Sequence, residues 1–244
     1  MRLAAARLRL HGVTASAQTA TGGQSAVQHR EVIVRGENIA LPGVLSLPSA
    51  PSGAVVFAHG SGSSRLSPRN IEVARVLNRA GLVTLLFDLL TEREALDRTN
   101  VFDIPLLARR LSAATRWLRA QPETERLPVG CFGASTGAAA ALWAAAETGV
   151  DVRAIVSRGG RPDLAAPRLS LVWAPTLLIV GGADTTVLEL NRAALADLRS
   201  CEHELAVVPG ASHLFEEPGA LEQVAELATG WFIRHLPPPA AAQR

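Results

Sequence analysis

The sequence contains no lysine and no tyrosine. All 24 basic side chains among its 244 residues belong to arginine. Without a lysine amine, the chain cannot form a Schiff base, a P-loop phosphate contact or a serine–lysine dyad. Without tyrosine, it has no phenolic general acid. These absences exclude several classes of enzyme before any motif is considered.

Cysteine and aromatic residues are also scarce. Cys131 and Cys201 are too few for a disulfide framework or a four-thiolate metal site. His203 and His213 lie ten residues apart, and the chain has no H-x-x-x-H spacing. Aromatic residues make up 4% of the chain, whereas a nucleic-acid binder needs a basic stripe with stacking aromatics. We therefore expect no metal, no cofactor and no nucleic-acid partner.

The two ends of the chain differ in composition from the rest. Residues 1–30 have no acidic side chain, and arginines interrupt their short apolar run, which argues against a secretory signal. A flexible N-terminal extension fits this composition better than a transit peptide does. Residues 237–244 are rich in proline and alanine. We therefore predict one globular domain over residues 31–236, between two tails.

One uncharged run has the length of a membrane span. Residues 127–146 contain no charged side chain, and about 20 apolar residues can cross a bilayer. Glycines at 130, 133 and 137 break this run in its middle. A buried strand, a tight turn and a buried helix would give the same pattern. We favour that interpretation, and expect no membrane partner and a cytoplasmic location.

The domain alternates short apolar runs with segments of helical periodicity. The apolar runs predict eight strands, at residues 31–35, 40–47, 54–58, 82–87, 127–132, 152–156, 176–180 and 204–208. The periodic segments predict helices at residues 71–79, 104–118, 136–148, 187–198 and 219–235. The first two strands lie too close together for a helical crossover, so we expect an antiparallel N-terminal hairpin. The rest predicts an α/β fold, a mostly parallel sheet with helices on both faces.

A G-x-S-x-G motif follows the fifth predicted strand. Gly133-Ala134-Ser135-Thr136-Gly137 lies between a predicted strand and a predicted helix. A serine on such a sharp turn is held in a strained conformation, and its hydroxyl points out over the edge of the sheet. The flanking glycines remove side chains that would collide with neighbouring backbone. The motif predicts a nucleophilic Ser135, and the alternative is an ordinary turn of small residues.

Two further polar residues follow later strands. Asp184 comes just after the strand at 176–180, and His213 follows the strand at 204–208. Reactive groups of parallel sheets collect at the carboxyl ends of strands, and Ser-Asp-His is the chain order of an α/β-hydrolase triad. Alone, Asp184 would be a helix N-cap and His213 an exposed loop residue. Together with Ser135 they predict a nucleophile, a base and an orienting carboxylate.

A glycine-rich loop follows the third predicted strand. In the loop 59–64, backbone amides freed by glycines can point at a developing oxyanion. The amide of Thr136, directly after Ser135, would be the second donor. A phosphate-binding loop is the competing interpretation, but Arg65 occupies the last glycine position of G-x-G-x-x-G. We expect His59 to orient the loop.

These motifs resemble the α/β-hydrolase superfamily, and most closely its compact dienelactone hydrolase-like branch. The resemblance covers residues 31–236 and implies the α/β-hydrolase fold without a large cap domain. It implies Ser135 as nucleophile, His213 as base and Asp184 as orienting acid, with the amides of Ser61 and Thr136 as oxyanion hole. Dienelactone hydrolase itself uses a cysteine nucleophile, so the chain resembles a serine-nucleophile member and general ester hydrolysis is favoured.

The expected substrate is a small to medium ester. The connection 157–175 is too short for an independent lid, so we expect an open, shallow site. Gly60, Arg65 and Arg158 are the weaker candidates for substrate binding. Arg158 and Arg161 can bind a substrate carboxylate, although a surface ion-pair cluster is the more common role for such residues.

We expect a serine carboxylic-ester hydrolase that works through an acyl-enzyme, with a small-molecule ester as its partner. The same triad would serve a dienelactone or other lactone hydrolase, or an acyltransferase. Outside acyl transfer, a catalytically silent binding module and a phosphate- or nucleotide-binding domain remain as alternatives. The oligomeric state, monomer or homodimer, stays open.

Overall fold

A computed structural model describes residues 27–36 and 39–238 of the chain. Most of the predicted N-terminal extension and residues 239–244 of the C-terminal tail lie outside these residues. The first strand begins at Gln28, three residues before the predicted start at Glu31. Residues 28–30 are therefore part of a strand, and the other limits of the predicted tails stay a prediction.

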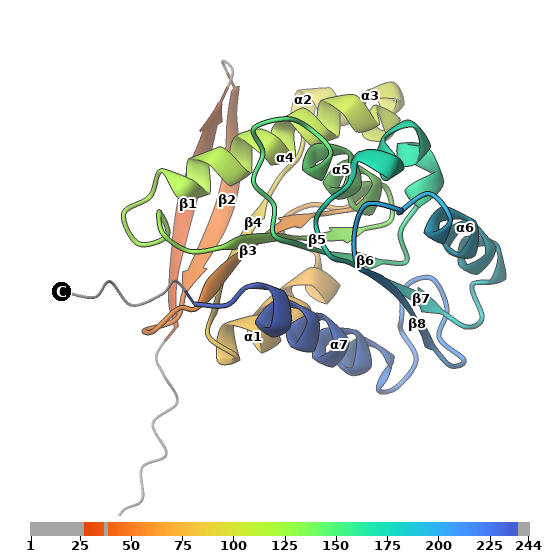
Figure 1. Ribbon diagram of the computed structural model, residues 1–244. Coiled ribbons are helices and arrows are strands. Elements are labelled where there is room, and N and C mark those ends of the chain that lie inside the picture. The colour runs from red at the N-terminus through yellow and green to blue at the C-terminus, as the bar shows by residue number, and fades with distance from the viewer. Residues whose placement is uncertain (1–26, 37–38, 239–244) are drawn as a thin grey trace, which may run out of the picture.

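The eight predicted strands form one sheet (Figure 1). The strands are β1 (Gln28–Gly36), β2 (Ile39–Leu47), β3 (Gly53–Ala58), β4 (Leu82–Phe87), β5 (Val129–Ala134), β6 (Ala154–Arg158), β7 (Thr176–Gly181) and β8 (His203–Val208). Their order across the sheet is β1-β2-β4-β3-β5-β6-β7-β8. β1 pairs with β2, and β2 with β4, in antiparallel fashion, while all other pairs are parallel. The predicted hairpin and the mostly parallel sheet are confirmed.

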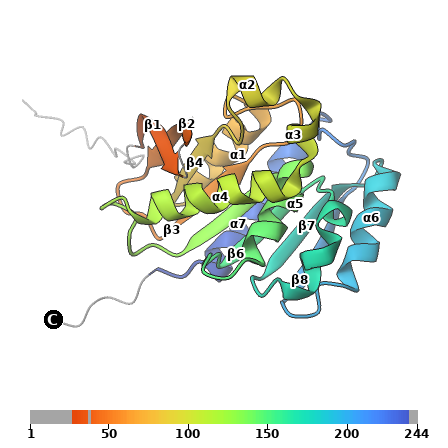
Figure 2. The same ribbon diagram turned by 90° about the horizontal axis from the view of Figure 1, so that it is seen from above.

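Helices cover both faces of this sheet (Figure 2). They are α1 (Pro68–Arg79), α2 (Glu92–Ala95), α3 (Arg98–Phe102), α4 (Ile104–Arg119), α5 (Thr136–Ala145), a 3-10 helix (Pro162–Leu171), α6 (Thr185–Leu195) and α7 (Ala220–His235). One hydrophobic core lies between the sheet and α4, α5 and the 3-10 helix, and another between the sheet and α1 and α7. β3 to β7 are buried along their whole length, as parallel strands covered on two faces must be.

Capping residues set where the helices begin. α1 starts three residues before the predicted Ile71, because the Ser67 hydroxyl caps the amide of Asn70 and Pro68 occupies the first turn. The Asp103 carboxylate accepts a 2.9 Å hydrogen bond from the amide of Leu106 and so caps α4. These caps fix where the connections into α1 and α4 end.

The uncharged run at residues 127–146 is a strand, a turn and a helix. It contains β5 and α5, joined at Ser135. Among the described residues, no helix has both the length and the apolar character needed to cross a membrane. The run is apolar because both elements are buried in the middle of the molecule.

Candidate active site

Ser135 occupies a strained turn between β5 and α5. Its φ of 50° and ψ of −119° lie in a region that non-glycine residues rarely adopt. Backbone hydrogen bonds hold this conformation: the Ser135 amide donates to the Arg158 carbonyl at 3.2 Å, and the Ser135 carbonyl accepts from Ala138 and Arg161. The strain is maintained by the surrounding structure, which is the behaviour expected of a residue placed for function.

The two glycines of the motif allow this turn to form. A Cβ atom on Gly133 would lie 2.4 Å from the Cα of Ala138, inside α5. A Cβ atom on Gly137 would lie 2.1 Å from the carbonyl oxygen of Ala58, at the end of β3. Both distances are far below van der Waals contact, so α5 packs against β5 and β3 only because these positions carry no side chain.

Asp184 and His213 form a direct pair. The Nδ1 of His213 lies 2.6 Å from Oδ2 of Asp184, between the ends of β7 and β8. Asp184 occupies the N-cap position of α6, yet its side chain makes no capping hydrogen bond. Its carboxylate is directed at the imidazole instead. Because Nδ1 donates to the carboxylate, the Nε2 atom of His213 is left as the proton acceptor.

The imidazole of His213 stands beside the backbone that holds Ser135. A Cβ atom on Gly159 would lie 3.4 Å from both Cε1 and Nδ1 of His213. Gly159 directly follows Arg158, whose carbonyl accepts the amide of Ser135. The Ser135 hydroxyl makes no hydrogen bond to any residue in the ranges 27–36 and 39–238. Hydrogen bonds between a nucleophile and its base often tighten only when substrate is bound.

The loop after β3 lies against the nucleophile turn. A Cβ atom on Gly60 would lie 3.1 Å from the Cβ of Ser135, so the loop passes directly over this residue. Thr136 is the first residue of α5, and the first amides of a helix have no partner inside the helix. The loop that carries Ser61 and the first turn of α5, which carries Thr136, thus both adjoin Ser135. The oxyanion hole formed by their two amides stays a prediction.

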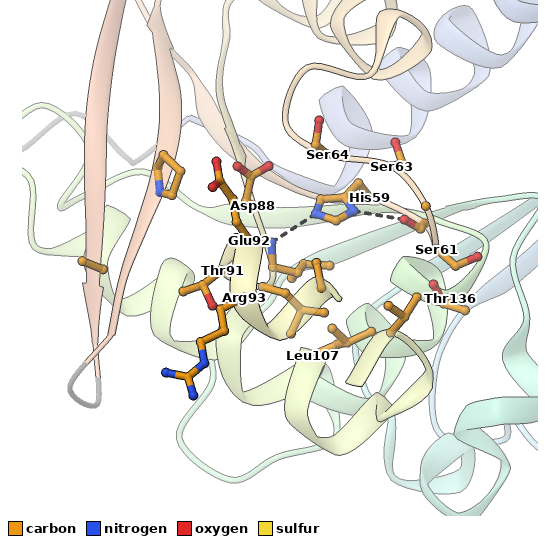
Figure 3. A pocket seen from close by; sticks show the side chains of 18 residues that line it. His59, Ser61, Ser63, Ser64, Asp88, Thr91, Glu92, Arg93, Leu107 and Thr136 are labelled. Atoms are coloured by element: carbon orange, nitrogen blue, oxygen red, sulfur yellow. Dashed lines mark hydrogen bonds between the residues drawn. The ribbon is translucent and has the colours of Figure 1, made fainter. Parts of the chain in front are cut away.

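His59 holds this loop in place. Its Nε2 atom accepts a 3.1 Å hydrogen bond from the amide of Leu89, and Nδ1 donates to the carbonyl of Gly60 at 3.0 Å (Figure 3). Burial lowers the pKa of His59 below its ordinary value, against a smaller opposing effect from that backbone bond and from Asp88. The imidazole is thus neutral and links the loop to the end of β4, in agreement with the orienting role expected from the sequence.

The three arginines of interest have different surroundings. Arg65 donates to Asp88 from its amide at 2.7 Å and from its guanidinium at 2.5 Å. Arg161 makes two hydrogen bonds to Asp163, which is the surface ion pair favoured by the sequence. Arg158 is only 7% exposed. Substrate binding by Arg65 and Arg158 stays a prediction.

A pocket of about 660 Å³ opens beside the turn, and the expected open, shallow site stays a prediction. Gly60, Ser61 and Thr136 line one end of it (Figure 3). The wall comes from α2 and α3, which follow β4, and no residue of the connection 157–175 after β6 is part of the lining. α2 and α3 were missed because they are short and bury no residue. Their local signals were the Thr91-x-x-Glu94 capping box of α2 and the N-cap Asp97 of α3.

Known proteins share this fold and much of this sequence. A model of the dienelactone hydrolase family matches residues 41–232. The solved structure of a dienelactone hydrolase from Anabaena variabilis is 55% identical, with a TM-score of 0.83, and the match covers 86% of this chain and 99% of that one. Est1E from Butyrivibrio proteoclasticus, at 15% identity and a TM-score of 0.71 over 84% of this chain and 98% of that one, shares the fold alone.

Two proteins of Mycobacterium tuberculosis are also similar. They come from strains CDC 1551 / Oshkosh and ATCC 25618 / H37Rv, and both carry the name "Putative phosphoribosyl transferase". Each is 61% identical over 210 residues, a match that covers 86% of this chain and 47% of the relative. The chain therefore spans about half the length of these curated relatives.

Proposed function

The chain belongs to the dienelactone hydrolase family, and on this basis we propose that it is a serine hydrolase of carboxylic esters. Ser135 is the nucleophile, His213 the general base, and Asp184 the residue that orients His213. The observation that carries the proposal is the 2.6 Å hydrogen bond between His213 and Asp184. A carboxylate that leaves its helix uncapped to bind an imidazole is arranged to fix the tautomer of that imidazole.

The reaction follows from these positions. The Ser135 oxygen attacks the ester carbonyl while its proton passes to Nε2 of His213. The amides of Ser61 and Thr136 stabilise the oxyanion of the tetrahedral intermediate. His213 then protonates the leaving alkoxide, and an acyl-enzyme remains on Ser135. Water attacks the acyl-enzyme with His213 as base, which releases the acid and restores the serine.

Cyclic esters are a second class of substrate to consider. The solved relative from Anabaena variabilis is named a dienelactone hydrolase, and opening a lactone needs the same attack and the same oxyanion hole. Phosphoribosyl transfer is not part of the proposal. The Mycobacterium tuberculosis relatives that bear this name are about twice as long, and the match covers 47% of them.

The test is hydrolysis of p-nitrophenyl esters and one lactone, together with labelling by a fluorophosphonate. We expect Ser135→Ala to abolish labelling and to lower kcat by about 10³–10⁶. Asp184→Asn should lower kcat somewhat less, because the imidazole keeps its place but loses its tautomer. Ser170→Ala and Asp163→Asn are matched controls, because Ser170 is exposed and Asp163 pairs with Arg161.

Two results would contradict the proposal. One is labelling that persists in Ser135→Ala, since the reactive serine would then lie elsewhere. The other is turnover in Asp184→Asn equal to that in Asp163→Asn, since His213 would then need no carboxylate.

A further inference from the structure

The pocket beside the turn borders one side of the candidate site only. It starts at Ser61 and Thr136, the two proposed oxyanion donors, and extends to Ala40 and Pro42 of β2 (Figure 3). His213 is not part of its lining. The pocket therefore opens from the oxyanion side of Ser135, away from the Asp184–His213 pair.

This position decides which part of an ester the pocket receives. In the proposed reaction, His213 must protonate the leaving alkoxide, so the alcohol part lies on the His213 side. The carbonyl oxygen lies between the amides of Ser61 and Thr136. The acyl chain is then the part that points away from His213. We infer that the 660 Å³ pocket binds the acyl chain of the substrate, an inference that rests on the proposed function.

The lining of the pocket indicates the chemistry of that chain. Its apolar lining residues include Leu89, Leu90, Val101 and Leu107, and the charged residues Asp88, Glu92 and Arg93 also line it. Val101 is partly exposed, and behind it Leu89, Leu90 and Leu107 belong to the hydrophobic core, so the apolar part of the lining is fixed in position. A volume of this size lies within the roughly 300–1,000 Å³ of small-molecule sites. The substrate class is therefore an ester with an extended apolar acyl chain.

The wall formed by α2 and α3 is held in position by hydrogen bonds to the carboxylate and the backbone carbonyl of Glu94. Glu94 accepts hydrogen bonds from the amide of Thr91 at 2.9 Å, from the Thr91 hydroxyl at 3.0 Å and from Arg110 of α4 at 2.9 Å. The backbone carbonyl of Glu94 accepts a further hydrogen bond, from the side-chain amide of Asn100 in α3. Glu94 thus ties both short helices to α4, which makes it a positioning residue for the acyl pocket.

A pair of neighbouring residues gives the sharpest test. Ala95 lines the pocket, whereas Leu96, which follows it, does not and is 86% exposed. We expect Ala95→Trp to narrow the pocket without burying new surface in the core, and Leu96→Trp to leave it open. The substrates are p-nitrophenyl esters of increasing acyl length, and separately acetate esters of increasing alcohol length.

The expected result is a change in acyl preference alone. In Ala95→Trp, the ratio of kcat/KM for a long acyl chain to that for acetate should fall about tenfold or more, while the ratio for long and short alcohols stays as in the wild type. Leu96→Trp should match the wild type in both series. Glu94→Gln should lower the acyl ratio in the same direction, mainly through KM, because the wall loses its charged link to Arg110.

The failures of this inference and of the proposed function are distinct. If Ala95→Trp changes the alcohol series and not the acyl series, the pocket holds the leaving group and the inference is wrong, while ester hydrolysis stands. If neither ratio changes, the pocket takes no part in substrate binding. If the wild type hydrolyses no ester of either series, the proposed function itself fails, and the acyl assignment fails with it.

Discussion

The side chain of Arg158 is buried, and its backbone carbonyl accepts a hydrogen bond from the amide of the candidate nucleophile Ser135. Its Nη1 atom has no hydrogen-bond partner, and within the described ranges 27–36 and 39–238 it forms no ion pair. Burial lowers the pKa of Arg158 to about 10, and the positive charge of Arg69 adds to this shift. A pKa lowered in the folded state means that folding disfavours the charged form. The positive charge of Arg158 therefore opposes folding at pH values below about 10.

Removing this charge should stabilise the protein. We expect Arg158→Met to raise the free energy of unfolding by about 1–3 kcal/mol, because replacing a buried charged group with an apolar one of similar volume is often stabilising. Urea unfolding at pH 7 measures the change. Arg168→Met is the control, because that guanidinium lies over the ring of Trp143 and loses a favourable contact. An Arg158→Met protein less stable than the wild type would show that the charge has a partner in solution.

The same variant tests the role predicted for Arg158 from sequence. A destabilising residue beside an active site is typically retained because it serves function. If Arg158 binds substrate, Arg158→Met should lower kcat/KM while it raises stability. An unchanged kcat/KM would remove Arg158 from the list of substrate-binding residues and leave Ser135, Asp184 and His213 unaffected.

At the scale of elements, the approach of α5 to β3 depends on Gly137. A methyl group at this position would lie 2.1 Å from the Ala58 carbonyl, which cannot move without breaking the pairing of β3. We expect Gly137→Ala to destabilise the fold by about 3 kcal/mol or more through this overpacking, although alanine favours helices. Thermal unfolding followed by circular dichroism measures it.

Gly230→Ala provides the matched control for this prediction. Gly230 lies inside α7, and a Cβ atom there would have no neighbour within 4 Å. The same substitution should therefore stabilise the protein by about 0.5–1 kcal/mol. If the two variants shift the unfolding temperature in the same direction, the close contact between α5 and β3 is not what excludes a side chain at position 137.

Elements were predictable from sequence where burial imposes a pattern. β3 to β7 are continuous apolar runs because both faces are covered, and α4 buries one face and so repeats apolar residues at helical spacing. Strand limits were displaced by up to three residues, at the start of β1; β5 starts two residues late, at Val129, after Pro128. α2 and the 3-10 helix carry no comparable pattern, because neither has a continuous buried face. Their positions follow from contacts with other segments.

At the scale of the whole molecule, too, sequence predicts what a local pattern carries and misses what several distant segments form together. Ser135, Asp184 and His213 were predicted together because strand ends of a parallel sheet meet at one edge, whatever their distance along the chain. The pocket was not predicted, because its lining comes from β2, the loop after β3, the segment after β4 and α4, and no single stretch of sequence carries its shape. The burial of Arg158 likewise depends on neighbours such as α1, which the sequence does not place.

The stability of the whole molecule should fall as the solution becomes acidic. Burial holds the pKa of His59 below its usual 6.5, so the unfolded chain takes up a proton first. The stabilisation from neutral His59 is complete above pH 6.5 and is lost as the pH falls below that value toward the folded pKa. His235 shifts in the same direction, again because burial disfavours its charge. The pKa of Glu94 is lowered from 4.5, so its contribution is lost only in the more acidic range below that value.

We therefore expect the midpoint of urea unfolding to fall between pH 7 and pH 5 in the wild type and to fall less in His59→Gln. Glutamine keeps a hydrogen-bonding side chain near the Leu89 amide but takes up no proton in this range. His203→Gln is the control, because that side chain is exposed and its Nδ1 atom bonds the Cys201 carbonyl, two residues away, at 3.1 Å. An equal loss of stability in His59→Gln and the wild type would mean that the acid sensitivity arises outside the loop that carries the oxyanion donors.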